Sequence, residues 1–139
     1  SRMDGIHAAV LSVKLKHLNT WTDERIAAAA RYNELLANHS SLTLPRTHEN
    51  CKHVYHLYVV QTAERNALQT HLTANGVGNA IHYPTSLPAM DCYQHLNTPV
   101  SDYPLAAAAC NRILSLPMFG ELKHTEVQKI TAFVCSFYH

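Results

Sequence analysis

The chain has 139 residues, of which 47% are hydrophobic and 15% are charged, and its formal net charge is +1 at pH 7. This length is typical of one domain, and the hydrophobic share excludes an intrinsically disordered chain. A charge this close to zero argues against an electrostatic nucleic-acid binder, which needs many clustered Lys and Arg residues.

Two helices are predicted at the start of the chain. Apolar residues recur at helical spacing from about residue 3 to residue 18, which predicts an amphipathic helix. Asn19 and Thr20 interrupt this pattern, and Thr20 with Asp23 resembles a capping box. A second helix is then predicted from Trp21 to about Asn38. We interpret residues 1–39 as connecting and interface helices, and the polar residues 39–50 as a loop.

The remainder of the chain, residues 40–139, alternates strand and helix signals. Residues 54–60 are β-branched, aromatic and apolar, which suits a central strand. Two shorter strands are predicted at residues 79–83 and 113–118, and a proline-containing loop at residues 85–100. Helices are predicted from a Thr62 cap to Asn75-Gly76, from Tyr103 to Arg112, and after a Thr125-x-x-Gln128 capping box. The predicted fold class is α+β, with two long N-terminal helices followed by a small three-stranded sheet packed with helices.

The eleven histidines raise the question of a metal site. If residues 54–60 form a strand, His53 and His56 point to opposite faces and cannot bind the same ion. No histidine or cysteine spacing matches a zinc motif. No metal site is therefore predicted.

The cysteines and the absence of long apolar runs bear on the compartment. Cys51, Cys92, Cys110 and Cys135 form no C-x-x-C pair, which is typical of free thiols in a reducing compartment. The first six residues hold no signal-peptide core, and no apolar run approaches the ~20 residues of a membrane helix. We expect a soluble, cytoplasmic protein.

Five blocks of the sequence resemble the C-terminal third of DegT/StrS-type nucleotide-sugar aminotransferases. The blocks occur in the family's order and span the whole chain, which makes the resemblance specific. They are Ser1–Asp4 with Ala8–Leu11, Arg31–Leu36, His53–Val59, Gly76–Pro84 and Leu114–Met118.

The resemblance implies part of a fold-type I pyridoxal-phosphate enzyme, the sequence matching its small C-terminal domain. In the family, the upstream large domain carries the lysine that binds the cofactor covalently and most of the phosphate site. None of the five lysines of this chain lies in that motif. We therefore expect no catalytic residue and no cofactor in this chain alone, and pyridoxal phosphate only in the full-length enzyme.

Three residues match functional positions of the family. Arg2 matches an arginine that reaches into the neighbouring subunit's active site beside the cofactor phosphate, and a guanidinium suits a phosphate group. His82 and Tyr83, followed by Pro84, match a segment at the substrate entrance, where they could hydrogen-bond sugar hydroxyls or a diphosphate. The resemblance thus implies Arg2 as a cofactor-binding residue and His82 and Tyr83 as substrate-binding residues.

Three functional hypotheses follow. The first is a C-terminal domain, or truncation, of a sugar aminotransferase that binds a nucleotide sugar only within a complete enzyme. The second is an orphan module without catalysis that associates with itself or a partner. The third is a small enzyme using His82 and Tyr83 as acid and base, for which no third orienting group is visible. For the chain without the large domain, the apolar face of the opening helices predicts a homodimer or higher oligomer with residues 2–36 at its interface.

Overall fold

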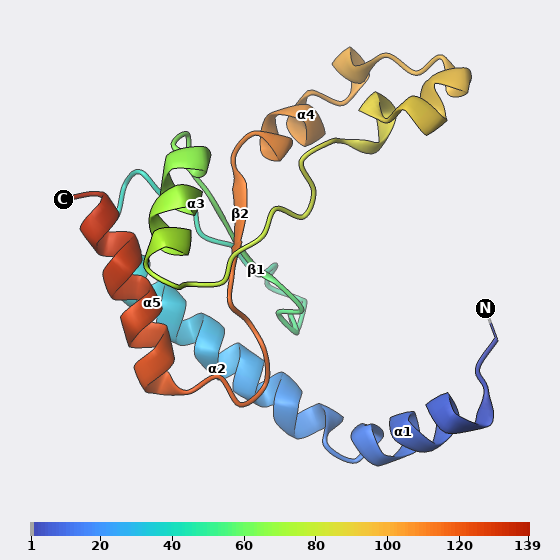
Figure 1. The fold of residues 1–139 in the computed structure, drawn as a ribbon, viewed down its shortest axis with the longest axis vertical. Coiled ribbons are helices and arrows are strands. Elements are labelled where there is room, and N and C mark those ends of the chain that lie inside the picture. Colours follow the sequence, from blue (N-terminus) through green and yellow to red (C-terminus); the bar gives the residue numbers. More distant parts are fainter. Residues whose placement is uncertain (1) are drawn as a thin grey trace.

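The computed structural model describes residues 2–139 and shows a helical body around a small sheet, with two projections (Figure 1). Five α-helices and two strands make up the regular structure of the described chain, with short 3-10 turns between Leu87 and Asp102. In chain order the elements are α1 (Gly5–Leu15), α2 (Leu18–Leu36), β1 (Tyr58–Gln61), α3 (Arg65–Ala74), α4 (Pro104–Cys110), β2 (Ile113–Leu116) and α5 (His124–Phe137).

The two opening helices form, but the break between them lies earlier than predicted. The Asp4 carboxylate caps α1 by accepting a hydrogen bond from the His7 N–H at 2.9 Å. The helix ends at Leu15 with Lys16 as its C-cap, and α2 begins after His17, whose carbonyl accepts from the Trp21 N–H. Thr20 consequently lies inside α2, and the predicted Thr20 capping box does not mark a helix start.

The sheet of the described chain has two strands, not the predicted three. β1 and β2 pair antiparallel, with Tyr58 opposite Leu116 and Gln61 opposite Ile113. The segment predicted as a further strand, residues 79–83, contributes one isolated bridge between Ala80 and Ser115. The pairing does not extend because Pro84 has no N–H to donate and the chain leaves the sheet there.

β1 is also shorter than predicted, because the residues just before it are not extended. Tyr55 has φ +47°, in the left-handed region that a β-strand excludes. Its N–H donates to the Nδ1 atom of His53 at 3.0 Å. His53 and His56 therefore precede the strand, so the prediction that they lie on opposite faces of it was wrong.

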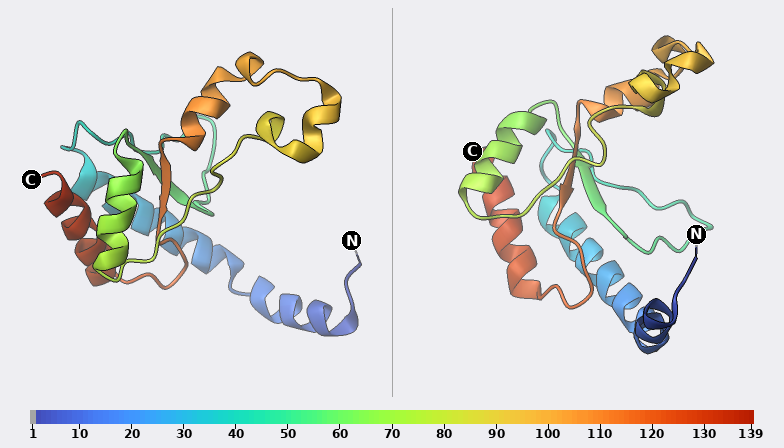
Figure 2. Two further views of the ribbon diagram at one scale, coloured as in Figure 1. Left: turned by 45° about the horizontal axis from the view of Figure 1, so that its top comes forward. Right: turned by 45° about the vertical axis from the view of Figure 1, so that its right-hand side comes forward.

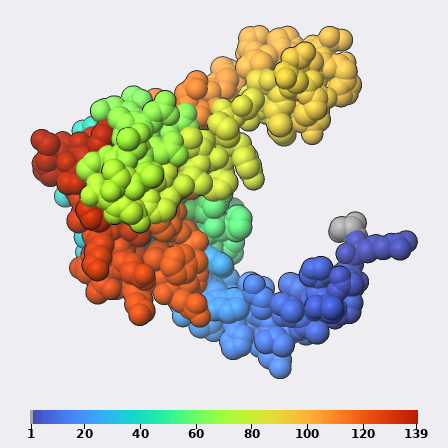
Figure 3. Space-filling model, in the orientation of Figure 1, coloured from blue at the N-terminus to red at the C-terminus, as the bar shows by residue number. Residues whose placement is uncertain are grey.

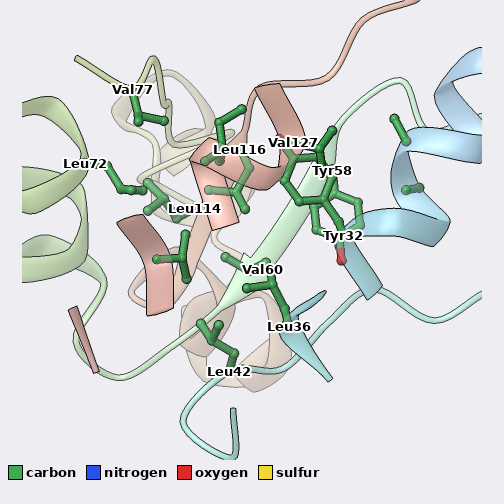
Figure 4. Packing of buried hydrophobic residues seen from close by; sticks show 14 of the residues in the cluster. Tyr32, Leu36, Leu42, Tyr58, Val60, Leu72, Val77, Leu114, Leu116 and Val127 are labelled. Carbon is green, nitrogen blue, oxygen red and sulfur yellow. The ribbon is translucent and has the colours of Figure 1, made fainter. Parts of the chain in front are cut away.

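The hydrophobic core lies between the sheet and the helices α2, α3 and α5. Helices α2 and α5 run side by side (Figures 1 and 2). Tyr32 of α2 and Tyr58 of β1 stack with ring centroids 4.6 Å apart at the centre of the cluster (Figure 4). Their hydroxyls donate to the Pro117 carbonyl at 3.0 Å and to the Asn33 side-chain oxygen at 2.7 Å. Burial raises the pKa of both tyrosines above the usual range, so both remain protonated donors.

Local sequence determines where the helices α3 and α5 begin and end. α3 ends at Ala74, and Gly76 two residues later has a φ of +71°, which is accessible at little cost to glycine, as predicted from Asn75-Gly76. Before α3, the Thr62 hydroxyl accepts from the Glu64 N–H at 3.2 Å. α5 begins earlier than the predicted capping box, because the Glu126 carboxylate accepts from the Lys123 N–H at 2.8 Å.

Two projections stand out from the body on the same side and leave an open concave face between them (Figure 3). We call residues 2–18 the N-terminal projection and residues 84–112 the arm. Within the described chain, no residue of α1 is buried. All exposed large hydrophobic residues except Val54, Tyr83 and Phe119 lie on these two projections. No helix among residues 2–139 has the length and apolar character to cross a membrane.

Candidate functional site

A cavity of about 930 Å³ lies where the arm leaves the sheet. Its walls come from the segment after the Ala80 bridge, from the start of the arm and from α4. Its lining is mostly apolar, and no described residue lining it is a lysine or an arginine. The lining residues are His82, Tyr83, Pro84, Thr85, Ser86, Leu87, Pro88, Met90, Tyr103, Ala106, Ala109, Cys110 and Ile113.

His82 is the histidine of this cavity, and its position is fixed by β2. The Ala80–Ser115 bridge holds the backbone two residues before it, with hydrogen bonds of 2.8 and 3.2 Å. The Nδ1 atom of His82 lies 2.8 Å from the Ser115 hydroxyl oxygen. The half-buried ring also lines a smaller cavity of about 260 Å³ that includes Ser115. His82 thus reaches the cavity from a fixed anchor on the sheet.

Tyr83 adds an exposed phenol beside His82. Its ring meets that of His82 edge to face, with centroids 5.5 Å apart, and the residue is 71% exposed. Tyr103, on the arm, also lines the cavity. The site therefore offers an imidazole, two phenols and aromatic faces, which suit a ligand with hydroxyl groups and a flat ring. His82 and Tyr83, which are adjacent in the sequence, both line this cavity.

Arg2 is not brought to this cavity. It is exposed ahead of α1, and the N-terminal end of the chain lies apart from the arm (Figure 1). Among residues 2–139 the ion pairs join Asp4 to His7, Arg31 to Glu34 and Lys52 to Asp23, so none uses Arg2. The guanidinium is therefore available to a group outside this chain.

The lysines test whether this chain fits pyridoxal phosphate, the cofactor implied by the resemblance. Lys14, Lys16, Lys52, Lys123 and Lys129 are all exposed on the body and the N-terminal projection. None of them lines the His82 cavity. The His82 cavity therefore offers no amine for a covalent bond to pyridoxal phosphate.

The remaining histidines and cysteines do not converge. Among residues 2–139, no group of three or more His, Cys, Asp or Glu side chains is placed to hold a metal ion. His39 and Cys135 form a pair, with Nε2 and Sγ 3.0 Å apart. Burial raises the pKa of the Cys135 thiol, which favours the protonated form as a donor to the imidazole.

Sequence reasoning missed two parts of the site. Ser115 and His82 are 33 positions apart, and nothing in the local pattern of either residue indicates the partner. Tyr103 is distant from His82 in the sequence, so only the folded chain shows that both line the cavity. The alternation of residues 113–116 was the one available signal, since it places Ser115 on the face opposite Leu114 and Leu116.

Comparison with known proteins gives one consistent result. The family model described as "DegT/DnrJ/EryC1/StrS aminotransferase family" matches residues 1–135. The erythromycin biosynthesis sensory transduction protein EryC1 of Saccharopolyspora erythraea is 36% identical over 132 residues, which are 95% of this chain and 36% of that protein. The dTDP-3-amino-3,4,6-trideoxy-alpha-D-glucose transaminase of Streptomyces venezuelae is 34% identical over 94% of this chain and 34% of that protein.

Solved structures agree with these sequence matches. The crystal structure of Streptomyces venezuelae DesV in complex with a ketimine intermediate superposes with a TM-score of 0.94 at 32% identity, covering 98% of this chain and 37% of that one. A DegT DnrJ EryC1 StrS aminotransferase from Brucella abortus gives a TM-score of 0.87 at 29% identity, covering 98% of this chain and 36% of that one. The chain spans about a third of the length of the relatives it matches.

Proposed function

The chain belongs to the DegT/DnrJ/EryC1/StrS aminotransferase family, and we propose that it forms the C-terminal part of a pyridoxal-phosphate-dependent nucleotide-sugar aminotransferase. One observation carries this proposal. The chain matches the DesV structure with a TM-score of 0.94 over 98% of its residues, while it covers 37% of that chain. Its fold therefore matches the corresponding part of the DesV chain.

In the proposed enzyme, this chain supplies part of the substrate wall. His82 and Tyr83 bind oxygen atoms of the nucleotide sugar at the cavity mouth, and the apolar lining excludes water around it. Arg2 binds an anionic group in a neighbouring active site, because it is exposed and outside every ion pair of residues 2–139. Pyridoxal phosphate, held by residues outside this chain, would supply the transfer of the amino group. We propose that the chain alone does not catalyse transamination.

A binding experiment tests the substrate wall. dTDP-glucose is titrated into the wild-type chain and into His82→Ala and His56→Ala, and heat or NMR shifts are measured. His56 is the matched control, since it is exposed and outside the cavity. We expect His82→Ala to weaken binding by about tenfold, the effect of one lost hydrogen bond at the upper end of its range. Binding that is equally strong in both variants would refute the assignment.

A second experiment tests whether this chain binds pyridoxal phosphate by itself. The wild-type chain is mixed with pyridoxal phosphate, and its absorbance is followed through dialysis. We expect no saturable band, because every lysine is exposed to solvent and none lines the cavity. A stoichiometric band that survives dialysis and disappears on replacing one lysine would show a cofactor site in this chain.

The exposed apolar face of the N-terminal projection favours a second candidate function, self-association. Ile6 is 80% exposed and Val10 is 53% exposed, one helical turn apart on α1. A second copy packed against residues 2–36 would bury this face and close the assembly with two-fold symmetry. The proposed state is a homo-oligomer through the N-terminal helices.

Sedimentation of the wild-type chain and of Ile6→Asp/Val10→Asp tests self-association. The control is Gln128→Asp/Ala132→Asp, which places two charges at the same spacing on the exposed side of α5. We expect the wild type and the control to sediment as oligomers and the α1 variant as a monomer. A monomeric wild type would refute the proposal.

A further inference from the structure

Ser115 is almost completely buried, and its hydroxyl has one hydrogen-bond partner. The residue is 4% exposed, and its backbone N–H and C=O are used by the Ala80 bridge. Among residues 2–139, the Ser115 hydroxyl makes its side-chain hydrogen bond to the Nδ1 atom of His82, at 2.8 Å. A buried hydroxyl hydrogen needs an acceptor, and Nδ1 is the acceptor that the structure provides.

The opposite end of the His82 ring is left for a ligand. Its Nε2 atom makes no hydrogen bond within the described chain. It is also not among the buried side-chain atoms without a partner, so it is accessible to solvent. Since His82 lines the large cavity, this nitrogen is the polar ring atom through which it can bind a ligand there.

We propose that Ser115 is a positioning residue that fixes His82 as the tautomer with its proton on Nε2. The Ser115 hydroxyl donates to Nδ1, which must then be unprotonated, and a neutral imidazole carries its proton on the other nitrogen. The reverse arrangement would leave the buried hydroxyl hydrogen without an acceptor. The identity of the ligand rests on the proposed function, whereas the tautomer of His82 depends only on the Ser115 contact within this chain.

The tautomer determines what His82 can recognise. A protonated Nε2 donates a hydrogen bond and cannot act as a base, so it binds an acceptor oxygen. A hydroxyl or phosphate oxygen of a nucleotide sugar has this chemistry. Ser115 thus sets the specificity of the cavity for an acceptor without contacting the ligand.

Nitrogen-15 NMR of the histidine side chains tests the tautomer directly, at about pH 8, where an ordinary histidine is neutral. Two histidines of the same chain calibrate the spectrum. The Nε2 atom of His71 lies 3.0 Å from the Phe133 carbonyl oxygen, and the Nδ1 atom of His95 lies 3.0 Å from the Cys92 carbonyl oxygen. A carbonyl can only accept, so His71 carries its proton on Nε2 and His95 on Nδ1.

We expect the two-bond correlation pattern of His82 to match His71 and to differ from His95. Ser115→Ala should convert His82 to a mixture of tautomers, while Ser115→Thr, which keeps the hydroxyl, should restore the wild-type pattern. A wild-type His82 with its proton on Nδ1 would overturn the proposal even if no variant folds. A Ser115→Ala spectrum with an unchanged His82 pattern would also overturn it.

Titration with dTDP-glucose separates this proposal from the proposed function. We expect Ser115→Ala to bind the probe about threefold to tenfold more weakly than the wild type, and Ser115→Thr to bind it normally. If the wild type has the expected tautomer and His82→Ala binds the probe as tightly as the wild type, the tautomer assignment is supported and the proposed substrate-binding role of His82 is refuted. If Ser115→Ala binds the probe as tightly as the wild type, the positioning role is refuted.

Discussion

Gly120→Ala should destabilise the chain through a clash with Trp21. Gly120 is buried in the loop between β2 and α5, directly against α2. A Cβ atom built there would lie 2.8 Å from Trp21 Cδ1 and 2.9 Å from both Trp21 Cβ and Cγ. Favourable carbon contacts are about 3.5–4.0 Å, so a separation of roughly 0.7 Å or more is required. The Trp21 Cβ is fixed to the helix backbone, so rotation of the side chain cannot relieve the clash.

The expected loss is about 1–2 kcal/mol of unfolding free energy. Overpacking typically costs about 1–3 kcal/mol, and the lower chain entropy of alanine in the unfolded state offsets about 0.4–1 kcal/mol of this. The shift should also weaken the neighbouring hydrogen bond from the Glu121 N–H to the Glu24 carboxylate, now 3.0 Å. Urea unfolding followed by fluorescence measures the loss, and Trp21 is the single tryptophan of the sequence.

Gly78→Ala is the matched control for this prediction. A Cβ at Gly78 would meet nothing within 4 Å, and its φ is not in the left-handed region. We expect Gly78→Ala to be neutral or stabilising by up to about 1 kcal/mol. The double variant Trp21→Ala/Gly120→Ala should lose the Gly120 penalty. Equal stabilities of Gly120→Ala and Gly78→Ala would refute the reasoning.

Three further predictions concern the side chains of Asp4, Tyr58 and His82. Hydrogen bonds from the His7 backbone and side chain hold the pKa of Asp4 below its usual range. The cap that Asp4 makes on α1 is therefore intact above the unfolded pKa and is lost as pH falls through the lowered folded pKa. Circular dichroism should show fraying of α1 below about pH 4, and Asp4→Asn should abolish this pH dependence. Tyr58→Phe should lower the unfolding free energy by about 1 kcal/mol or more, because the Asn33 side-chain oxygen loses its donor, and a urea midpoint unchanged from wild type would contradict this. His82→Ala should cost less than ~2 kcal/mol in the same assay, since the residue is half-buried and outside the core cluster, and a larger loss would assign it a structural role.

The helices were largely predictable because their signals are local. Apolar spacing predicted both opening helices, and Asn75-Gly76 predicted the end of α3, where Gly76 has φ +71°. The break before α2 was misplaced by a few residues. Polar residues at 19 and 20 resemble an interruption, but they lie on the exposed side of a helix that is held from Trp21 onward by tertiary contacts.

The sheet was less predictable because pairing depends on distant residues. Residues 54–57 have strand composition, but Tyr55 adopts the left-handed region and its phenol donates to or accepts from Thr47 at 3.1 Å, within the polar loop. Residues 79–83 likewise have strand composition, and one bridge to Ser115 forms before the chain departs at Pro84. Composition indicated an extended chain in both segments, but it could not show how many residues of each segment pair with a neighbouring strand.

Only one wall of the candidate cavity could be predicted from the sequence. The His82-Tyr83-Pro84 segment was singled out by its resemblance, and the structure places it at a cavity of about 930 Å³. The other walls come from the arm and α4, and the Ser115 anchor comes from β2, 33 positions away. Such contacts depend on the path of the chain and leave no periodic trace in the sequence.

The Ala80–Ser115 bridge has a consequence for how the arm can change. The bridge closes a loop that contains the whole arm, residues 84–112. The entropy lost in closing a flexible loop rises only with the logarithm of its length, so doubling that length costs about 0.6 kcal/mol. The arm also contributes none of the buried core residues. Insertions and deletions in the arm can therefore reshape one wall of the cavity while the body keeps nearly all of its stability, so the arm is the part of the chain most free to acquire a new ligand preference.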